Sequence, residues 1–122
     1  MKLTTLEGMR SEIFVPITPK PVFTELKKPL SECKVAFITA GGIHKKSQTP
    51  FNTSGDFSYR TIEFDTPSSE LMVTHGGFDN SDINKDVNAM FPIDRLHELV
   101  EEGFIGSLPK ETYTFMGGGG NV

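Results

Sequence analysis

Short apolar segments separated by long polar stretches define the elements that this sequence predicts. Residues 34–40 (KVAFITA) are almost continuously apolar, rich in β-branched and aromatic side chains, and followed by two glycines. This pattern is typical of a strand buried on both faces. Residues 60–65 alternate between apolar and polar side chains, as in a half-buried strand. Residues 71–74 and 110–116 predict two further strands.

One segment has clear helical periodicity. Pro92 suits the first turn of a helix, and Gly103 suits its end. Apolar side chains recur at helical spacing between them, so a helix is expected over residues 92–102. Those apolar positions are Ile93, Leu96, Leu99 and Val100.

The remaining segments predict an extended arm and long loops. Four prolines lie between residues 14 and 29, and they exclude a helix or central strand there. We therefore expect residues 1–31 to form an extended N-terminal arm. Residues 43–59 and 75–86 are polar and lack a clear period, which predicts two loops. Loops this long within a compact domain are often functional.

Together these elements predict an α/β fold with a small, mainly parallel sheet and few helices, formed by residues 32–122. A chain of 122 residues has room for one hydrophobic core. The last predicted strand runs into the glycines at 117–120. In a parallel sheet such a strand is followed by a helix that covers one face. Because that helix is missing, we expect the sheet to be incomplete, or completed by a partner chain.

Composition and charge exclude several classes of function. The formal net charge is -4 and charges of both signs are interspersed, which disfavours nucleic acid and membrane surfaces as partners. Residues 1–11 do not resemble a signal peptide, and no segment approaches the apolar length of a membrane span. A single cysteine, Cys33, excludes an internal disulfide and suits a reducing cytoplasm.

Glycine-rich polar loops follow the predicted strands. If the strands are parallel, these loops converge at one edge of the sheet, where ligands of open α/β sheets bind. Their glycines permit close approach of the backbone to a ligand or partner. None has the spacing of a dinucleotide fingerprint or a phosphate-binding loop. The candidate site residues in these loops are Gly41, Gly42, His44, His75, Gly76, Gly77 and Asp79.

Two interpretations stay open for several polar side chains. His44 and His75 could donate a proton or bind a carboxylate, or each could hydrogen-bond to loop backbone. Asp56 and Arg60 could form an ion pair that fixes the long loop, or Arg60 could bind a substrate carboxylate. His97, on the predicted helix, is expected to be structural.

We expect no metal site and no catalytic thiol in this chain. The acidic residues of the loop at 75–86 do not have the spacing of a calcium loop, and they suit turns and helix caps instead. Cys33 has no CxxC partner and no helix N-terminus to activate it, so a structural role is expected.

Several motifs resemble the selenoprotein B family of glycine, sarcosine, betaine and D-proline reductases. They are FVPITPKPV (14–22), AGGIHKKS (40–47), FNTSGDFSYR (51–60), the long segment MVTHGGFDNSDINKDVNAMFPIDRLHELVEEGFIGSL (72–108) and FMGGGGNV (115–122). The combination of VTHGGFDN with FPIDRLHELVEEGFI is specific, and it looks most similar to the D-proline-reducing members.

The resemblance implies a reductase subunit that works beside a pyruvoyl-bearing partner subunit. In such an enzyme a selenolate attacks the α-carbon of D-proline, the ring C–N bond breaks to give 5-aminovalerate, and a thiol electron donor supplies the electrons. The selenocysteine, or its cysteine counterpart, is expected in a selenium-bearing segment downstream of Val122. The nucleophile therefore corresponds to no residue here, and the isolated chain is expected to be inactive.

The resemblance implies that the loop residues given above, together with Asp56 and Arg60, lie at the edge of the sheet that supports the site. It assigns no individual catalytic role to any of them. The chain is then expected to be a fragment or a processed N-terminal part of the subunit. The alternative is a non-catalytic module of the same family, which assembles with a partner or binds a small carboxylate.

Overall fold

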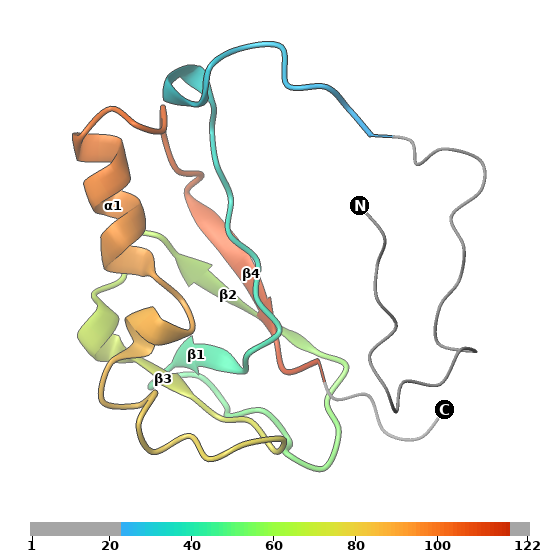
Figure 1. The fold of residues 1–122 in the computed structure, drawn as a ribbon. Helices are drawn as coiled ribbons and strands as arrows, with labels where there is room; N and C mark the ends of the chain where they lie inside the picture. Colours follow the sequence, from blue (N-terminus) through green and yellow to red (C-terminus); the bar gives the residue numbers. More distant parts are fainter. Residues whose placement is uncertain (1–22, 118–122) are drawn as a thin grey trace, which may run out of the picture.

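Two small antiparallel sheets and one helix make up the fold (Figure 1). The structure is a computed structural model that describes residues 23–117. The strands are β1 (Ile43–Lys45), β2 (Tyr59–Glu63), β3 (Leu71–Val73) and β4 (Glu111–Phe115), and the helix is α1 (Ile93–Glu101). Single 3-10 turns occupy Leu30–Glu32, Ser68–Glu70 and Val87–Ala89. Strand β1 pairs with β3, and β2 pairs with β4.

The prediction of a mainly parallel sheet is wrong. Both ladders are antiparallel, with Ile43 opposite Val73 in one and Tyr59 opposite Phe115 in the other. Among the described residues, the parallel pairings are two isolated bridges. Parallel neighbours need a long crossover, usually a helix. Helix α1 instead lies in sequence between β3 and β4, which belong to different sheets, so it connects no parallel pair.

The segment at residues 34–40 is not the doubly buried strand that its composition predicts. It runs beside β4 (Figure 1) and is bridged near its two ends, at Lys34–Ser107 and Thr39–Thr114. Its odd-numbered side chains are half-buried, whereas its even-numbered ones are exposed, including Ile38 at 62%. The apolar run therefore has one face against the protein and one open face.

Strand β1 lies inside the segment that the sequence predicts as a loop. Ile43 and His44 are both fully buried, and Ile43 belongs to the main hydrophobic cluster. A three-residue strand with two polar side chains gives no periodic signal, because the pattern needs about four residues to emerge.

The core lies where α1, the two sheets and the turn before the helix meet. Ile62 and Phe64 point into it, as their alternation predicts, and α1 contributes Ile93 and Leu96. Phe91 is fully buried, and its ring stacks against Phe64 at 6.0 Å between centroids. Burying such a side chain contributes about 1.5–3 kcal/mol. The predicted helix is confirmed to within one residue at each end.

Two further observations concern the expected arm and membrane association. Residues 23–32 are exposed, and most of the predicted arm lies outside the described residues. In the described part of the chain, no helix combines the length and the apolar character that crossing a bilayer requires.

Candidate functional site

Three segments far apart in sequence meet at one point of the fold. The Gly42 N–H donates to the Phe115 carbonyl at 2.8 Å, and the Thr74 N–H donates to the Gly42 carbonyl at 2.9 Å. The start of β1 and the ends of β3 and β4 therefore come together. The sequence predicts such a convergence from parallel strands, but antiparallel pairing produces it.

Two glycines make this close approach possible. Gly42 has a φ of +75°, and a Cβ there would lie 2.3 Å from the Thr74 carbonyl oxygen. A Cβ on Gly76 would lie 2.2 Å from the Thr53 carbonyl oxygen. The long loop before β2 thus packs directly on the loop after β3, and a side chain at either glycine would separate the segments.

These loops enclose a small hollow of about 160 Å³. Among the described residues that line it, His75 is the one titratable side chain, and Met116 directly after β4 forms another wall. The lining residues are Thr53, Ser54, Gly55, His75, Gly76, Gly77 and Met116. We treat this hollow as the candidate site, because it unites the glycine loop with the end of β4.

His75 is held by its own loop. Its Nδ1 accepts a hydrogen bond from the Gly77 N–H at 2.8 Å, and its ring stacks on Phe78 at 4.4 Å between centroids. Asn80 donates to the His75 carbonyl at 2.9 Å. Because Nδ1 is an acceptor, the neutral ring carries its proton on Nε2. No hydrogen bond among residues 23–117 uses that Nε2–H, so it can donate to a ligand.

His44 occupies a different environment and cannot contact a ligand in this fold. It is fully buried within β1. The Lys45 carbonyl lies 2.8 Å from its Nδ1, and the Thr74 hydroxyl lies 2.9 Å from its Nε2. A carbonyl can only accept, so Nδ1 donates and Nε2 accepts. The Nδ1 bond stays within β1 and the Nε2 bond links β1 to the residue after β3, so both ring nitrogens are occupied.

Arg60 is fully engaged in fixing the long loop. Its guanidinium donates to the Thr49 carbonyl at 2.9 Å and the Pro50 carbonyl at 3.2 Å. It also donates to the Ser58 hydroxyl at 2.7 Å and the Tyr59 carbonyl at 3.0 Å. The guanidinium lies 4.2 Å above the centre of the Phe51 ring. These contacts leave little donor capacity for a substrate carboxylate.

Asp56 completes this arrangement. It pairs with Arg60 at 3.7 Å. It accepts hydrogen bonds from the Ser58 hydroxyl, from the Asn52 N–H at 2.9 Å and from the Ser58 N–H at 2.8 Å. The pKa of Asp56 is lowered from 3.8 to about 2. The main cause is the hydrogen bond from the Ser58 hydroxyl, followed by the bonds from the two N–H groups and the charge of Arg60. The carboxylate therefore organises the loop and stays ionised at neutral pH.

The remaining acidic residues near the glycine loop form turns. Asp79 is exposed and accepts from the Ser81 N–H at 2.9 Å, which lowers its pKa. Asp82 pairs with Lys85, and Asp86 caps the turn at Val87–Ala89. Within residues 23–117, no group of three or more His, Cys, Asp or Glu is arranged to hold a metal ion.

Cys33 and His97 lie apart from the hollow. The Cys33 thiol is buried and donates to the Pro29 carbonyl at 3.3 Å. It precedes the Lys34–Ser107 bridge, whereas Thr39, at the far end of the same segment, reaches the end of β4. His97 bonds through Nε2 to the Phe64 carbonyl at 2.6 Å, so it links α1 to the end of β2.

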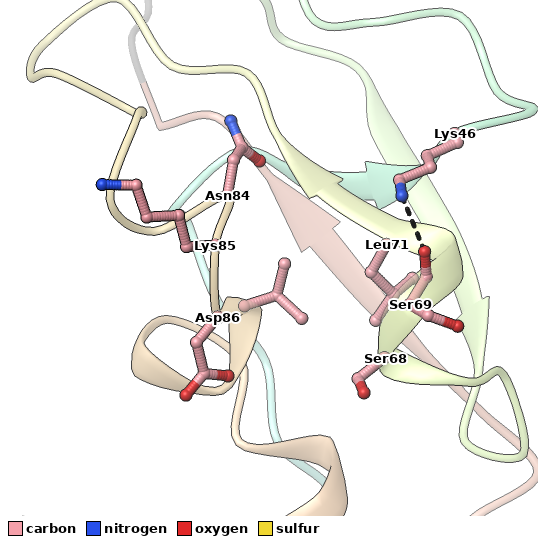
Figure 2. A pocket seen from close by; sticks show the side chains of 8 residues that line it. Lys46, Ser68, Ser69, Leu71, Asn84, Lys85 and Asp86 are labelled. Carbon is pink, nitrogen blue, oxygen red and sulfur yellow. Dashed lines mark hydrogen bonds between the residues drawn. The ribbon is translucent and has the colours of Figure 1, made fainter.

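A second hollow, of about 320 Å³, was not indicated by the sequence (Figure 2). Lys46 projects into it and donates to the Ser69 carbonyl at 2.7 Å. The Asn84 side chain forms two hydrogen bonds with the backbone of Val73 in β3. It accepts from the Val73 N–H at 2.7 Å and donates to the Val73 carbonyl at 3.1 Å. These polar groups hold β3 in place. Sequence patterns give no signal for a side chain that substitutes for a strand partner.

Comparison with known proteins gives a family assignment. Residues 3–122 match the family described as glycine/sarcosine/betaine reductase selenoprotein B (GRDB). The D-proline reductase subunit gamma of Acetoanaerobium sticklandii is 51% identical over 119 residues, which cover 98% of this chain and 49% of that protein. The glycine reductase complex component B subunit gamma of Symbiobacterium thermophilum is 32% identical, over 93% of this chain and 29% of that protein.

A third relative is the sarcosine reductase complex component B subunit beta of Peptoclostridium acidaminophilum. It is 30% identical over 93% of this chain and 28% of its own length. No solved structure matches this chain. The chain thus spans half or less of the length of these relatives. The resemblance seen in the sequence motifs is confirmed, and the chain belongs to the glycine/sarcosine/betaine reductase selenoprotein B family.

Proposed function

We propose that this chain is part of the selenoprotein subunit of a D-proline reductase. The observation that carries the proposal is the contrast in identity among relatives. Identity is 51% with the D-proline reductase subunit but 32% and 30% with the subunits of glycine and sarcosine reductases. The relative with the higher identity is therefore the better guide to the substrate.

The proposed reaction is the reductive opening of D-proline. The bond between the ring nitrogen and the α-carbon breaks, and two electrons and two protons from a dithiol give 5-aminovalerate and a disulfide. A selenolate outside this chain and a pyruvoyl carbonyl on a partner subunit would supply the nucleophile and the electrophile.

The proposed contribution of this chain is to position the substrate. The Nε2–H of His75 is free to donate to a carboxylate oxygen at the edge of the hollow. Gly76 lets this loop pack closely against the Thr53 backbone, and the Asp56–Arg60 pair keeps the opposing loop in place. A preformed donor of this kind limits the loss of entropy when the substrate is ordered for reaction.

The alternative role is a non-catalytic module that assembles with a partner or binds a small carboxylate. The Cys33 thiol is buried and bonded to backbone away from the hollow, so it supplies a nucleophile in neither role. Under either proposal the isolated chain has no reductase activity.

The test is reconstitution. The chain is co-expressed with the selenium-bearing segment and the pyruvoyl-bearing subunit, and the complex is assayed with a dithiol on D-proline, glycine, sarcosine and betaine. We expect 5-aminovalerate from D-proline and no product from the isolated chain. Preference for another of these substrates would contradict the substrate assignment. A stable complex that reduces none of them would support the non-catalytic module.

A further inference from the structure

The sheet formed by β2 and β4 has one open face that is unusually aromatic. Its register places Tyr59 opposite Phe115, and Tyr113 two residues before Phe115 on the same side. The Tyr59 ring lies 5.4 Å from that of Tyr113 and 6.2 Å from that of Phe115. Ile38 and Phe57 extend this surface, and we name the five residues the aromatic face. Their exposed fractions are Ile38 62%, Phe57 79%, Tyr59 57%, Tyr113 42% and Phe115 36%.

One end of the aromatic face is hollowed. A depression of about 560 Å³ is lined by Ile38, Phe57 and Phe115 together with Thr39, Ala40, Asp56 and Gly117. It lies at the end of β4, where the described part of the chain stops. Depressions of this size accept apolar side chains from a binding partner, and contiguous exposed apolar surface of this kind marks interaction sites.

The other end of the same face carries two carboxylates, of which Glu111 has no ion-pair partner among the described residues. Glu63 and Glu111 are direct cross-strand partners on the outward side of the ladder. Lys45 pairs with Glu63 at 2.6 Å, whereas Glu111 is exposed and its nearest polar contact is the Tyr113 hydroxyl at 3.5 Å. Like charges directly opposite are unfavourable. A basic side chain from an occupant would relieve this, so the occupant is apolar at one end and basic at the other.

We propose that the aromatic face docks an amphipathic helix from the half of the D-proline reductase selenoprotein subunit that this chain does not match. The chain covers 49% of that relative, so a polypeptide of similar length remains to be placed in the family's subunit. The depression adjoins Gly117, so that polypeptide needs little length to reach it when it continues from β4. A helix is the usual cover of an open sheet face.

A second copy of the chain fits the face less well. Each copy carries a net charge of -4, and each would bring its own Glu63–Glu111 pair to the interface. A face that meets its own copy gains no basic partner for these carboxylates. The inference rests on family membership and holds whichever amino acid the complex reduces.

The test is co-purification of the full chain with the unmatched half of the Acetoanaerobium sticklandii subunit, expressed as a separate tagged polypeptide. Ile38→Glu and Tyr113→Glu each place a charge on the aromatic face. Phe104→Glu is the matched control, since Phe104 is 60% exposed and lies after α1. We expect wild type and the control to be retained, and each face variant to bind roughly tenfold or more weakly, as at an interface hot spot.

Thermal unfolding of each variant provides the folding control, and unfolding temperatures close to that of wild type are expected because the substituted side chains are exposed. Equal retention of the face variants, or no retention of wild type, would overturn the proposal. So would a wild-type homodimer that Ile38→Glu dissociates, which would make a second copy the occupant. Retention that appears only after removal of residues 1–22 would instead show that those residues occupy the face.

Discussion

His75 is the residue on which the candidate site depends most. His75→Ala removes the ring N–H that lines the hollow. In the reconstituted complex we expect kcat/KM for D-proline to fall roughly tenfold or more, since a hydrogen bond to a charged group is worth about 1.5–3 kcal/mol. Steady-state assays of 5-aminovalerate formation measure the change.

Asp79→Asn is the control for this substitution, because it changes the same loop while an asparagine can still accept from the Ser81 N–H. It should leave kcat/KM near the wild-type value. If both variants lose activity equally, general disturbance of the loop explains the loss and His75 has no special role.

Asp56 gives a prediction about pH. Its pKa is about 2 in the folded chain against an ordinary value of 3.8, so folding favours the ionised form. The stabilisation is complete above about pH 5 and is lost as the pH falls through the ordinary pKa toward about 2. Asp56→Asn should therefore destabilise the chain at pH 6, and this difference should shrink as the pH is lowered.

Urea unfolding of wild type and Asp56→Asn between pH 6 and pH 2.5 measures this dependence. Asp82 is a suitable control, because it is a highly exposed residue whose ion pair with Lys85 lies on the surface. For Asp82→Asn we expect only a small change in unfolding free energy. A difference between wild type and Asp56→Asn that does not vary with pH would contradict the assignment.

Cys33 is expected to have no part in assembly or catalysis. A serine at this position can still donate to the Pro29 carbonyl, so Cys33→Ser should leave assembly and turnover of the complex unchanged. Reacting atoms must approach to about 3–3.5 Å, and this thiol is buried beyond the far end of the 34–40 segment. Dithiol-dependent activity of the isolated chain that disappears in Cys33→Ser would overturn the proposed location of the nucleophile.

At the scale of single residues, the sequence indicates which side chains are candidates for the site but not what surrounds each of them. His44 and His75 both stand next to glycines and apolar runs, and the pattern treats them alike. The structure distinguishes them, because His44 is enclosed and doubly hydrogen-bonded while His75 keeps one nitrogen available. Burial of an individual polar residue depends on contacts between distant segments, which local patterns do not contain.

At the scale of elements, the turn before β1 is tightly constrained. Gly42 and Gly103 both have positive φ, but a Cβ on Gly42 would meet the Thr74 carbonyl whereas a Cβ on Gly103 would meet nothing within 4 Å. Gly103→Ala should cost about 1–2 kcal/mol from backbone strain alone. Gly42→Ala should cost clearly more, because the Gly42–Thr74 hydrogen bond is also disturbed.

Chemical denaturation of the two alanine variants compares these costs directly. Equal losses of stability would show that backbone strain is the whole effect and that the close approach to Thr74 is not needed.

The predicted helix and three of the predicted strands are present in the structure. The helix at 92–102 and the strands at 60–65, 71–74 and 110–116 correspond to α1, β2, β3 and β4. The segment at 34–40 was wrongly predicted as doubly buried, because Ala36, Ile38 and Ala40 face outward. Apolar side chains occur both in the core and on surfaces that bind a partner. The sequence alone does not distinguish these two locations.

At the scale of the whole molecule, strand direction was the main error. The predicted elements together indicated a mainly parallel sheet, and convergence of the loops was expected only if the strands were parallel. The convergence of the glycine segments was still anticipated, since Gly42, Thr74 and Phe115 are joined by hydrogen bonds. Pairing direction depends on which strands become neighbours, and connections of these lengths do not determine that.

The position of β4 in the chain also affects how the protein is made. This strand comes last among the described elements, yet Thr112 bonds to Phe37, and Thr114 bonds to Ile43 and Arg60, across separations of 75, 71 and 54 residues. During synthesis the earlier segments cannot form these contacts until β4 has been made, and until then Ile62 and Phe64 lack their final packing environment. Folding that depends on such distant contacts is slow and leaves intermediates prone to aggregation. The nascent chain is therefore expected to need chaperone protection until residues 111–116 have been synthesised.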